Sequence, residues 1–131
     1  MTAPIVLVTG ATRGIGFAAA RQLAARGANV IIASRELPRA EKAARQIGGS
    51  TEAIPLDITD DASVLKSVDL IRNRHGRLDV LANNSGVLLD NSGSLSSLKP
   101  KTLRETIETN LIGTFRVSQA MLPLLKKSPT L

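Results

Sequence analysis

The stretch Thr9-Gly10-Ala11-Thr12-Arg13-Gly14-Ile15-Gly16 stands between a short apolar run and an amphipathic segment of helical length. Glycines at these positions allow a tight turn, and they let backbone N–H groups at a helix N-terminus approach a pyrophosphate closely. A glycine triplet alone also suits a purely structural turn, but the strand before it and the helix after it favour nucleotide binding. No Gly-Lys-Ser/Thr follows, so this is not a Walker loop. The predicted nucleotide contacts here are Gly10, Thr12, Arg13, Gly14, Ile15 and Gly16.

Four apolar runs of strand length extend from this stretch along the chain, at residues 5–8, 30–33, 53–56 and 80–82. Continuous apolar runs are typical of strands that are covered on both faces, as in a parallel sheet. Pro55 lies in the third run and predicts a sheet edge, because proline cannot donate to the hydrogen-bond ladder.

Helical patterns separate these runs and follow the last one. The first helix is expected to end before Gly27, the second to cover residues 37–47, the third to begin after an Asp60 N-cap, and the fourth to begin near Pro100. Pro123 should kink or end the fourth helix near Leu125. Residues 91–97, rich in serine and glycine, are predicted to form a mobile loop. The predicted inward residues are Ile15, Ala19 and Leu23, then Val64, Leu65, Val68 and Ile71, then Leu103, Ile107, Leu111 and Leu122.

The alternation of strands and helices predicts an α/β fold. With right-handed crossovers it becomes a Rossmann-type, doubly wound parallel sheet of four strands in the order 3-2-1-4, with helices on both faces. We expect residues 1–131 to form a single domain, because the length suits one core and the composition (43% hydrophobic, 21% charged) is ordinary for a globular protein.

Composition argues against several classes of function. Without cysteine, the chain has no disulfide, thiolate metal site or Cys nucleophile, and no metal site is predicted. The net charge of +6 is spread over many segments, and the only aromatic residues are two phenylalanines, so a nucleic-acid-binding domain is a distant alternative. No signal-like or membrane-spanning apolar run is visible, which predicts a cytoplasmic protein without a membrane partner.

The glycine spacing resembles the T-G-x-x-x-G-x-G motif of the short-chain dehydrogenase/reductase family. Further matches occur in the expected order: Leu56-Asp57-Ile58 resembles the segment that contacts adenine, and Asn83-Asn84-Ser85-Gly86 resembles the N-N-A-G signature, with Ser85 in place of alanine. Asn110 matches the asparagine in the middle of the fourth helix. Together the matches cover nearly the whole chain, and carbonyl-reductase-like members are the nearest.

The resemblance implies a role for each matched residue. It implies that Asp57 and Ile58 contact adenine, that Asn83, Asn84, Ser85 and Gly86 line the cofactor, and that Asn110 is a catalytic residue that bends its helix and holds a water of the proton relay. Simpler alternatives stay open: Asp57 could cap a turn, Asn83 and Asn84 could be turn residues, and Asn110 could bond a nearby carbonyl.

Charge at the end of the second strand predicts the choice of cofactor. An NAD site places an acidic residue there to accept from the ribose 2′-OH, whereas this chain has Ser34 and Arg35. Both can donate to a 2′-phosphate, and Arg13 can reach it from the glycine turn, so NADP (NADPH) is predicted to be preferred over NAD. Glu36 is the counter-candidate, because an inward carboxylate would favour NAD.

Hydride transfer in the family requires a serine and a Tyr-x-x-x-Lys pair, in which the tyrosine is the acid/base. The 131 residues contain no tyrosine and stop at Leu131, where a fifth strand would begin, so the chain looks truncated and is expected to be inactive alone. His75, in a surface turn, is a poor substitute. The chain is therefore either the cofactor half of an oxidoreductase or a non-catalytic NADP-binding module, regulatory or vestigial. An unpaired fourth strand and an exposed fourth helix predict self-association or a partner chain.

Overall fold

A four-stranded parallel sheet forms the centre of the computed structural model, which describes residues 2–87 and 93–129. Its order is β3 (Thr51–Pro55), β2 (Asn29–Ser34), β1 (Ile5–Thr9) and β4 (Val80–Ala82), which confirms the predicted 3-2-1-4 order. Leu7 of β1 pairs with Ile31 on one side and Leu81 on the other. Pro55 ends the edge strand β3, where its missing N–H disrupts no further ladder.

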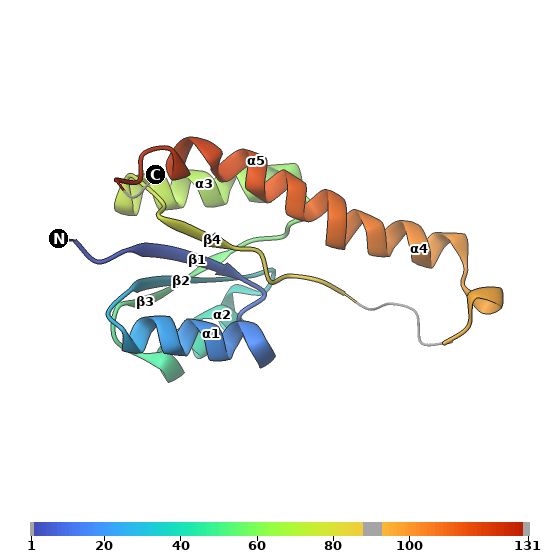
Figure 1. The fold of residues 1–131 in the computed structure, drawn as a ribbon, viewed down its shortest axis with the longest axis horizontal. Helices are drawn as coiled ribbons and strands as arrows, with labels where there is room; N and C mark the ends of the chain where they lie inside the picture. The colour runs from blue at the N-terminus through green and yellow to red at the C-terminus, as the bar shows by residue number, and fades with distance from the viewer. Residues whose placement is uncertain (1, 88–92, 130–131) are drawn as a thin grey trace.

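Two pairs of helices cover the two faces of this sheet (Figure 1). One face carries α1 (Gly14–Ala25) and α2 (Leu37–Ile47), and the other carries α3 (Asp61–His75) and α5 (Thr114–Leu125). Because side chains alternate across a strand, Val6 and Val8 pack toward α1 and α2 while Ile5 and Leu7 pack toward α3 and α5.

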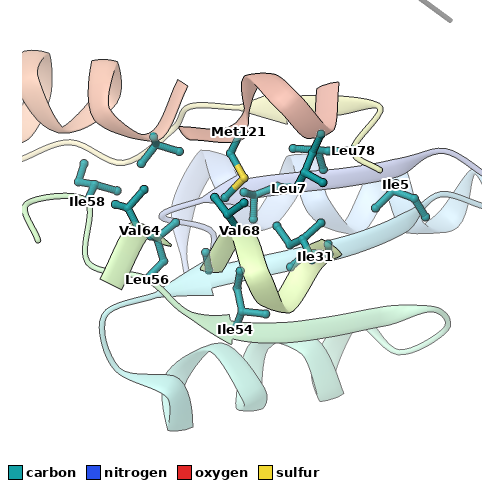
Figure 2. Packing of buried hydrophobic residues seen from close by; sticks show 14 residues of the cluster. Ile5, Leu7, Ile31, Ile54, Leu56, Ile58, Val64, Val68, Leu78 and Met121 are labelled. Carbon is teal, nitrogen blue, oxygen red and sulfur yellow. The ribbon is translucent and has the colours of Figure 1, made fainter. Parts of the chain in front are cut away.

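The core on the α3 and α5 side is the larger of the two in side-chain volume. Leu7 and Ile31 from the sheet meet Val68 of α3 and Met121 of α5, as Figure 2 shows. Leu7, Ile31 and Met121 are fully buried. This packing holds the strands in place, and the candidate site lies at their carboxyl ends.

The inward face of α1 differs from the predicted one. Gly16 and Ala20 are buried, with Leu23 partly buried, whereas Ile15 is 84% exposed and Ala19 is also exposed. The helix lies close to the sheet near the glycine turn, so the smallest side chains face inward and Ile15 is turned to solvent. On α3, Val64, Val68 and Ile71 are buried as predicted, but Leu65 is exposed because it lies one residue beyond that stripe.

The predicted fourth helix is three helical segments in succession. They are α4 (Pro100–Ile107), the π-helical η2 (Glu108–Gly113) and α5, which ends at Leu125 as Pro123 predicted. Its buried residues are Gly113, Val117, Met121 and Leu124, and the four residues predicted to face inward are all exposed: Leu103, Ile107, Leu111 and Leu122. The prediction was wrong for Leu103 and Ile107 because α4 extends beyond the sheet, where no described segment covers it (Figure 1). It was wrong for Leu122 because this residue lies outside the buried stripe of α5.

The loop predicted at residues 91–97 lies partly outside the described residues, at 91 and 92. Within the described part, Leu95–Ser97 forms the short 3₁₀ helix η1 rather than irregular loop. Serine hydroxyls stabilise this turn, since Ser97 Oγ donates to the Ser94 carbonyl over 3.2 Å. No helix among the described residues is long and apolar enough to cross a membrane.

Candidate functional site

A cavity of about 390 Å³ opens at the carboxyl ends of β1, β2 and β3. In parallel sheets this edge is where ligands bind, in the crevice at which the strand order reverses. The segments that follow β1, β2, β3 and β4 all contribute to its walls. Of the residues predicted to contact a nucleotide, those lining it are Gly10, Thr12, Arg13, Gly14, Ser34, Arg35, Asp57, Ile58, Asn84, Ser85 and Gly86.

The glycine turn forms the floor of this cavity, and two of its glycines have no room for a side chain. Gly10 has a φ of 61°, and a Cβ there would lie 3.0 to 3.2 Å from atoms of Ser85. A Cβ at Gly16 would overlap Asn84 Nδ2 and lie 2.7 Å from the Gly10 carbonyl oxygen. By contrast, no atom lies within 4 Å of a Cβ position at Gly14, whose φ is 62°. The turn is thus closed toward the protein and open toward the cavity.

Thr9 and Asn84 hold the turn against the segment after β4. The buried Thr9 Oγ1 accepts hydrogen bonds of 3.0 Å from the backbone N–H groups of both Asn84 and Ser85. Asn84 Nδ2 donates to the Gly10 carbonyl over 2.9 Å. Thr9 is not among the predicted site residues, although it is the threonine of the T-G-x-x-x-G-x-G motif and the polar end of an otherwise apolar strand.

The wall after β3 is built around the Asp57 side chain. Asp57 Oδ1 accepts from the Thr59 hydroxyl at 2.6 Å and from the Thr59 N–H at 3.0 Å. Burial raises the pKa of Asp57, but these bonds and the charges of Arg35 and Arg116 outweigh it, so its pKa lies below its ordinary value. Asp57 therefore carries a negative charge at neutral pH and organises the local turn, as the simpler alternative holds, while also lining the cavity.

The wall after β2 carries most of the charge. Ser34, Arg35, Glu36 and Arg39 all line the cavity there, with Arg13 contributed by the glycine turn. Ser34 Oγ accepts from the Glu36 N–H over 3.2 Å. Glu36 and Arg39 form an ion pair of 2.6 Å. Among the described residues, no carboxylate pairs with Arg13 or Arg35, so both guanidinium groups keep their donors for a ligand.

Asn83 and Asn110 serve the frame of the site and do not line the cavity. Asn83 Nδ2 donates to Ser118 Oγ of α5 over 3.1 Å. Asn110, in the π-helical η2, accepts from the Val87 N–H at 2.7 Å and donates to the Val87 carbonyl at 2.8 Å. The Asn110 side chain thus pairs with both backbone polar groups of Val87, as a residue of a neighbouring strand would. The carbonyl belongs to Val87, 23 residues away in the chain, so the contact is not the local helix bond of the simpler alternative.

Some predicted residues do not line the cavity, and some residues that line it were not predicted. Ile15 and Gly16 do not line the cavity: Ile15 faces solvent, and Gly16 is buried beneath Asn84. His75 pairs with Glu52 over 2.8 Å near the start of β3, at the opposite end of the sheet. No group of three metal-ligating side chains occurs in residues 2–87 and 93–129. Lining residues to which no binding role had been assigned are Ala33, Arg39, Leu56, Thr59, Val87 and Thr109.

The fold, with its glycine turn at the switch point between β1 and β4, defines an α/β domain of the Rossmann type. The chain belongs to the short-chain dehydrogenase family, whose profile matches residues 4–130.

Curated relatives agree with this assignment. The 3-oxoacyl-[acyl-carrier-protein] reductase FabG of Escherichia coli is 40% identical over 123 residues, which make up 94% of this chain and 50% of FabG. The short-chain dehydrogenase anuI of Penicillium roqueforti is 36% identical over 133 residues, covering 98% of this chain and 52% of that protein. The chain thus spans about half the length of the curated relatives that it matches.

Solved structures show the same likeness in three dimensions. The Pseudomonas aeruginosa RhlG/NADP active-site complex superposes with a TM-score of 0.90 at 31% identity, covering 98% of this chain and 50% of that one. A metagenomic short-chain oxidoreductase in complex with NADP has a TM-score of 0.84 at 32% identity, covering 95% of this chain and 57% of that one.

Proposed function

We propose that residues 1–131 act as one domain that binds NADP(H) in preference to NAD(H) and forms the cofactor-binding part of a short-chain oxidoreductase of cytoplasmic location, carbonyl-reductase-like in subgroup. The observation that carries the proposal is the wall after β2, where Ser34 and Arg35 line the cavity together with Arg13. Unpaired guanidinium groups suit the dianionic 2′-phosphate that distinguishes NADP from NAD. Similarity to two proteins solved with NADP supports this choice.

The residues present fit a dinucleotide. The closed contacts at Gly10 and Gly16 and the open space at Gly14 give a turn over which a diphosphate can approach the backbone. In the proposal, Thr12 and the glycine turn hold the diphosphate, Arg13 reaches the 2′-phosphate, and Asp57 and Ile58 lie beside the adenine. Asn84, Ser85 and Gly86 then face the rest of the nucleotide, which supplies hydride chemistry when bound.

We propose that Asn110 positions the Val87 backbone at the site through its two hydrogen bonds. The proton donor that the family resemblance implies is a tyrosine, and these 131 residues contain none. A non-catalytic NADP-binding module is therefore the second candidate, and we do not propose that the 131 residues transfer hydride by themselves. Nucleotide binding is common to both candidates, so it is the property to test first.

Titration of the chain with NADPH and with NADH, followed by calorimetry, should show tighter binding of NADPH. Arg35→Asp should weaken NADPH binding by roughly 10- to 100-fold, because a charge-assisted hydrogen bond is lost and a repulsive carboxylate replaces it. NADH binding should change much less.

Arg45→Asp is the matched control, since it makes the same charge change near the outer end of α2, away from the cavity lining. Equal affinity of the unmodified chain for the two nucleotides would contradict the proposed preference. An intact fold that binds neither would contradict the proposed function as a whole.

A further inference from the structure

The wall that faces the proposed 2′-phosphate contains one carboxylate, that of Glu36. Arg39, in the first turn of the helix that Glu36 precedes, holds this carboxylate in an ion pair. Glu36 Oε2 lies 2.6 Å from Arg39 Nε, and both side chains line the cavity beside Arg35. An acidic side chain at this place would repel a phosphate and could accept from a ribose 2′-OH. Whether the Glu36 carboxylate is paired or free therefore affects the choice of nucleotide.

The start of α2 brings these two side chains together. Glu36 is the N-cap residue, and the helix begins at Leu37 with a proline in its first turn. The Arg39 N–H donates to the Glu36 carbonyl over 3.0 Å, so the backbone spacing of the pair is fixed by the first helical turn. Residues three apart on a helix are neighbours on its surface, which gives the ion pair its short distance.

Arg39 also belongs to a basic region that continues beyond the cavity. A second hollow of about 290 Å³ adjoins the first and is lined by Thr12, Arg13, Arg39, Lys42, Ala43 and Gln46. Its cations place positive charge behind Arg39 and leave the Glu36 carboxylate as the single negative group along this wall of the described cavity.

We propose that Arg39 determines nucleotide specificity by holding Glu36: the pair neutralises the carboxylate on the wall after β2 that would otherwise select against a 2′-phosphate. This inference rests on the proposed NADP preference. It distinguishes Arg39 from Arg35 and Arg13, which form no ion pair with the described residues and act on the phosphate directly. When Arg39 is lost, the freed Glu36 repels NADPH and accepts from the 2′-OH of NADH.

A double-mutant cycle tests this coupling, with NADPH and NADH each titrated against the unmodified chain, Arg39→Gln, Glu36→Gln and the double variant. Arg39→Gln should lower the ratio of NADPH to NADH affinity by up to about fivefold, the range of an exposed ion pair. Glu36→Gln should raise that ratio, and Arg39→Gln made in the Glu36→Gln chain should lower it clearly less.

Arg45→Gln is the matched control: Arg45 lies on the same helix, also pairs with a glutamate (Glu41, 3.9 Å), and lies outside the cavity lining. Circular dichroism of each variant establishes that α2 is retained. If Arg39→Gln lowers the ratio equally in both backgrounds, Arg39 acts only as a further cation and the inference is overturned. If the unmodified chain shows no preference for NADPH, the proposed function fails first and the inference fails with it.

Discussion

Gly10 and Gly14 adopt almost the same backbone conformation, with φ of 61° and 62°, in very different surroundings. Gly10 lies against Ser85, whereas a Cβ at Gly14 would meet open space. The pair therefore separates two reasons for a glycine: the backbone angle, which both share, and close packing, which only Gly10 has. Sequence spacing alone treats the two positions alike.

Replacing each glycine by alanine should show this difference in stability. Gly14→Ala should cost only the left-handed conformation, about 1–2 kcal/mol, whereas Gly10→Ala should cost about 1–3 kcal/mol more because Ser85 must shift. Urea unfolding of both variants without nucleotide measures the two costs. Equal losses of unfolding free energy would show that the contact with Ser85 does not restrict this position.

The ends of several elements meet at one carboxylate, that of Asp79, between α3 and β4. Asp79 accepts from the Ile5 N–H at 2.7 Å, from Ser128 Oγ after α5 at 2.6 Å and from Arg77 Nε at 3.1 Å. Its side chain is only 4% exposed. Burial raises the pKa of Asp79, but the bonds from Ser128, Ile5 and Arg77 outweigh it and hold the pKa below its ordinary value of 3.8.

A folded-state pKa below the unfolded one means that the ionised Asp79 stabilises the fold above the unfolded pKa. This contribution is lost as the pH falls below about 4 and through the pKa of the folded state. Asp79→Asn should therefore lower the unfolding free energy at pH 7 and flatten its decrease in acid. Urea unfolding between pH 7 and pH 3 measures both effects.

Asp69→Asn is the control, because exposed Asp69 pairs along the surface of α3 with Arg72 at 2.6 Å. Exposed ion pairs contribute little, so its unfolding should follow the unmodified chain. A pH dependence of Asp79→Asn that matches the unmodified chain would show that Asp79 is not the group that links these elements to acid stability.

The molecule as a whole presents an apolar row that no part of the described chain covers. Leu103, Ile107, Leu111 and Phe115 follow one another at intervals of four residues along α4, η2 and the start of α5, and all are exposed. Among the described strands β4 is also at an edge, next to β1, and its Val80 is exposed. An apolar row and an open strand edge both favour association.

We expect the 131-residue chain to self-associate through this row at micromolar concentration. Sedimentation velocity should show the mean mass rising with concentration, and Phe115→Gln should weaken the association. Leu65→Gln is a matched control, because Leu65 on α3 and Phe115 are both 62% exposed. A chain that stays monomeric at every concentration, or that responds equally to both substitutions, would contradict this role for the row.

Much of this architecture is already visible in the sequence, for local physical reasons. The four apolar runs predict the strands and their parallel order, since short apolar segments that alternate with helices leave few possible topologies. Glycine spacing predicts the turn, and Asp60 does cap α3, accepting from the Ala62 N–H at 3.0 Å. These features depend on neighbours in the chain, so a pattern in the sequence is sufficient to reveal them.

Other features depend on which surface a residue meets. Ile15 and Leu65 have the right side chains for a core, yet the helices turn them to solvent because Gly16 and Val64 take the inward positions. Arg39 resembles any other surface arginine until the structure places it on the cavity wall against Glu36.

The class of fold, the order of the strands and the location of the glycine turn thus follow from the amino-acid sequence alone, because hydrophobic period and backbone freedom act over a few residues. The folded chain was needed to show which helix faces are buried, how Thr9, Asn84 and Asn110 hold the site together, and which charges pair along its walls. Those outcomes depend on contacts between segments as far apart as Thr9 and Asn84, which lie 75 residues apart in the chain, and no local pattern encodes such contacts.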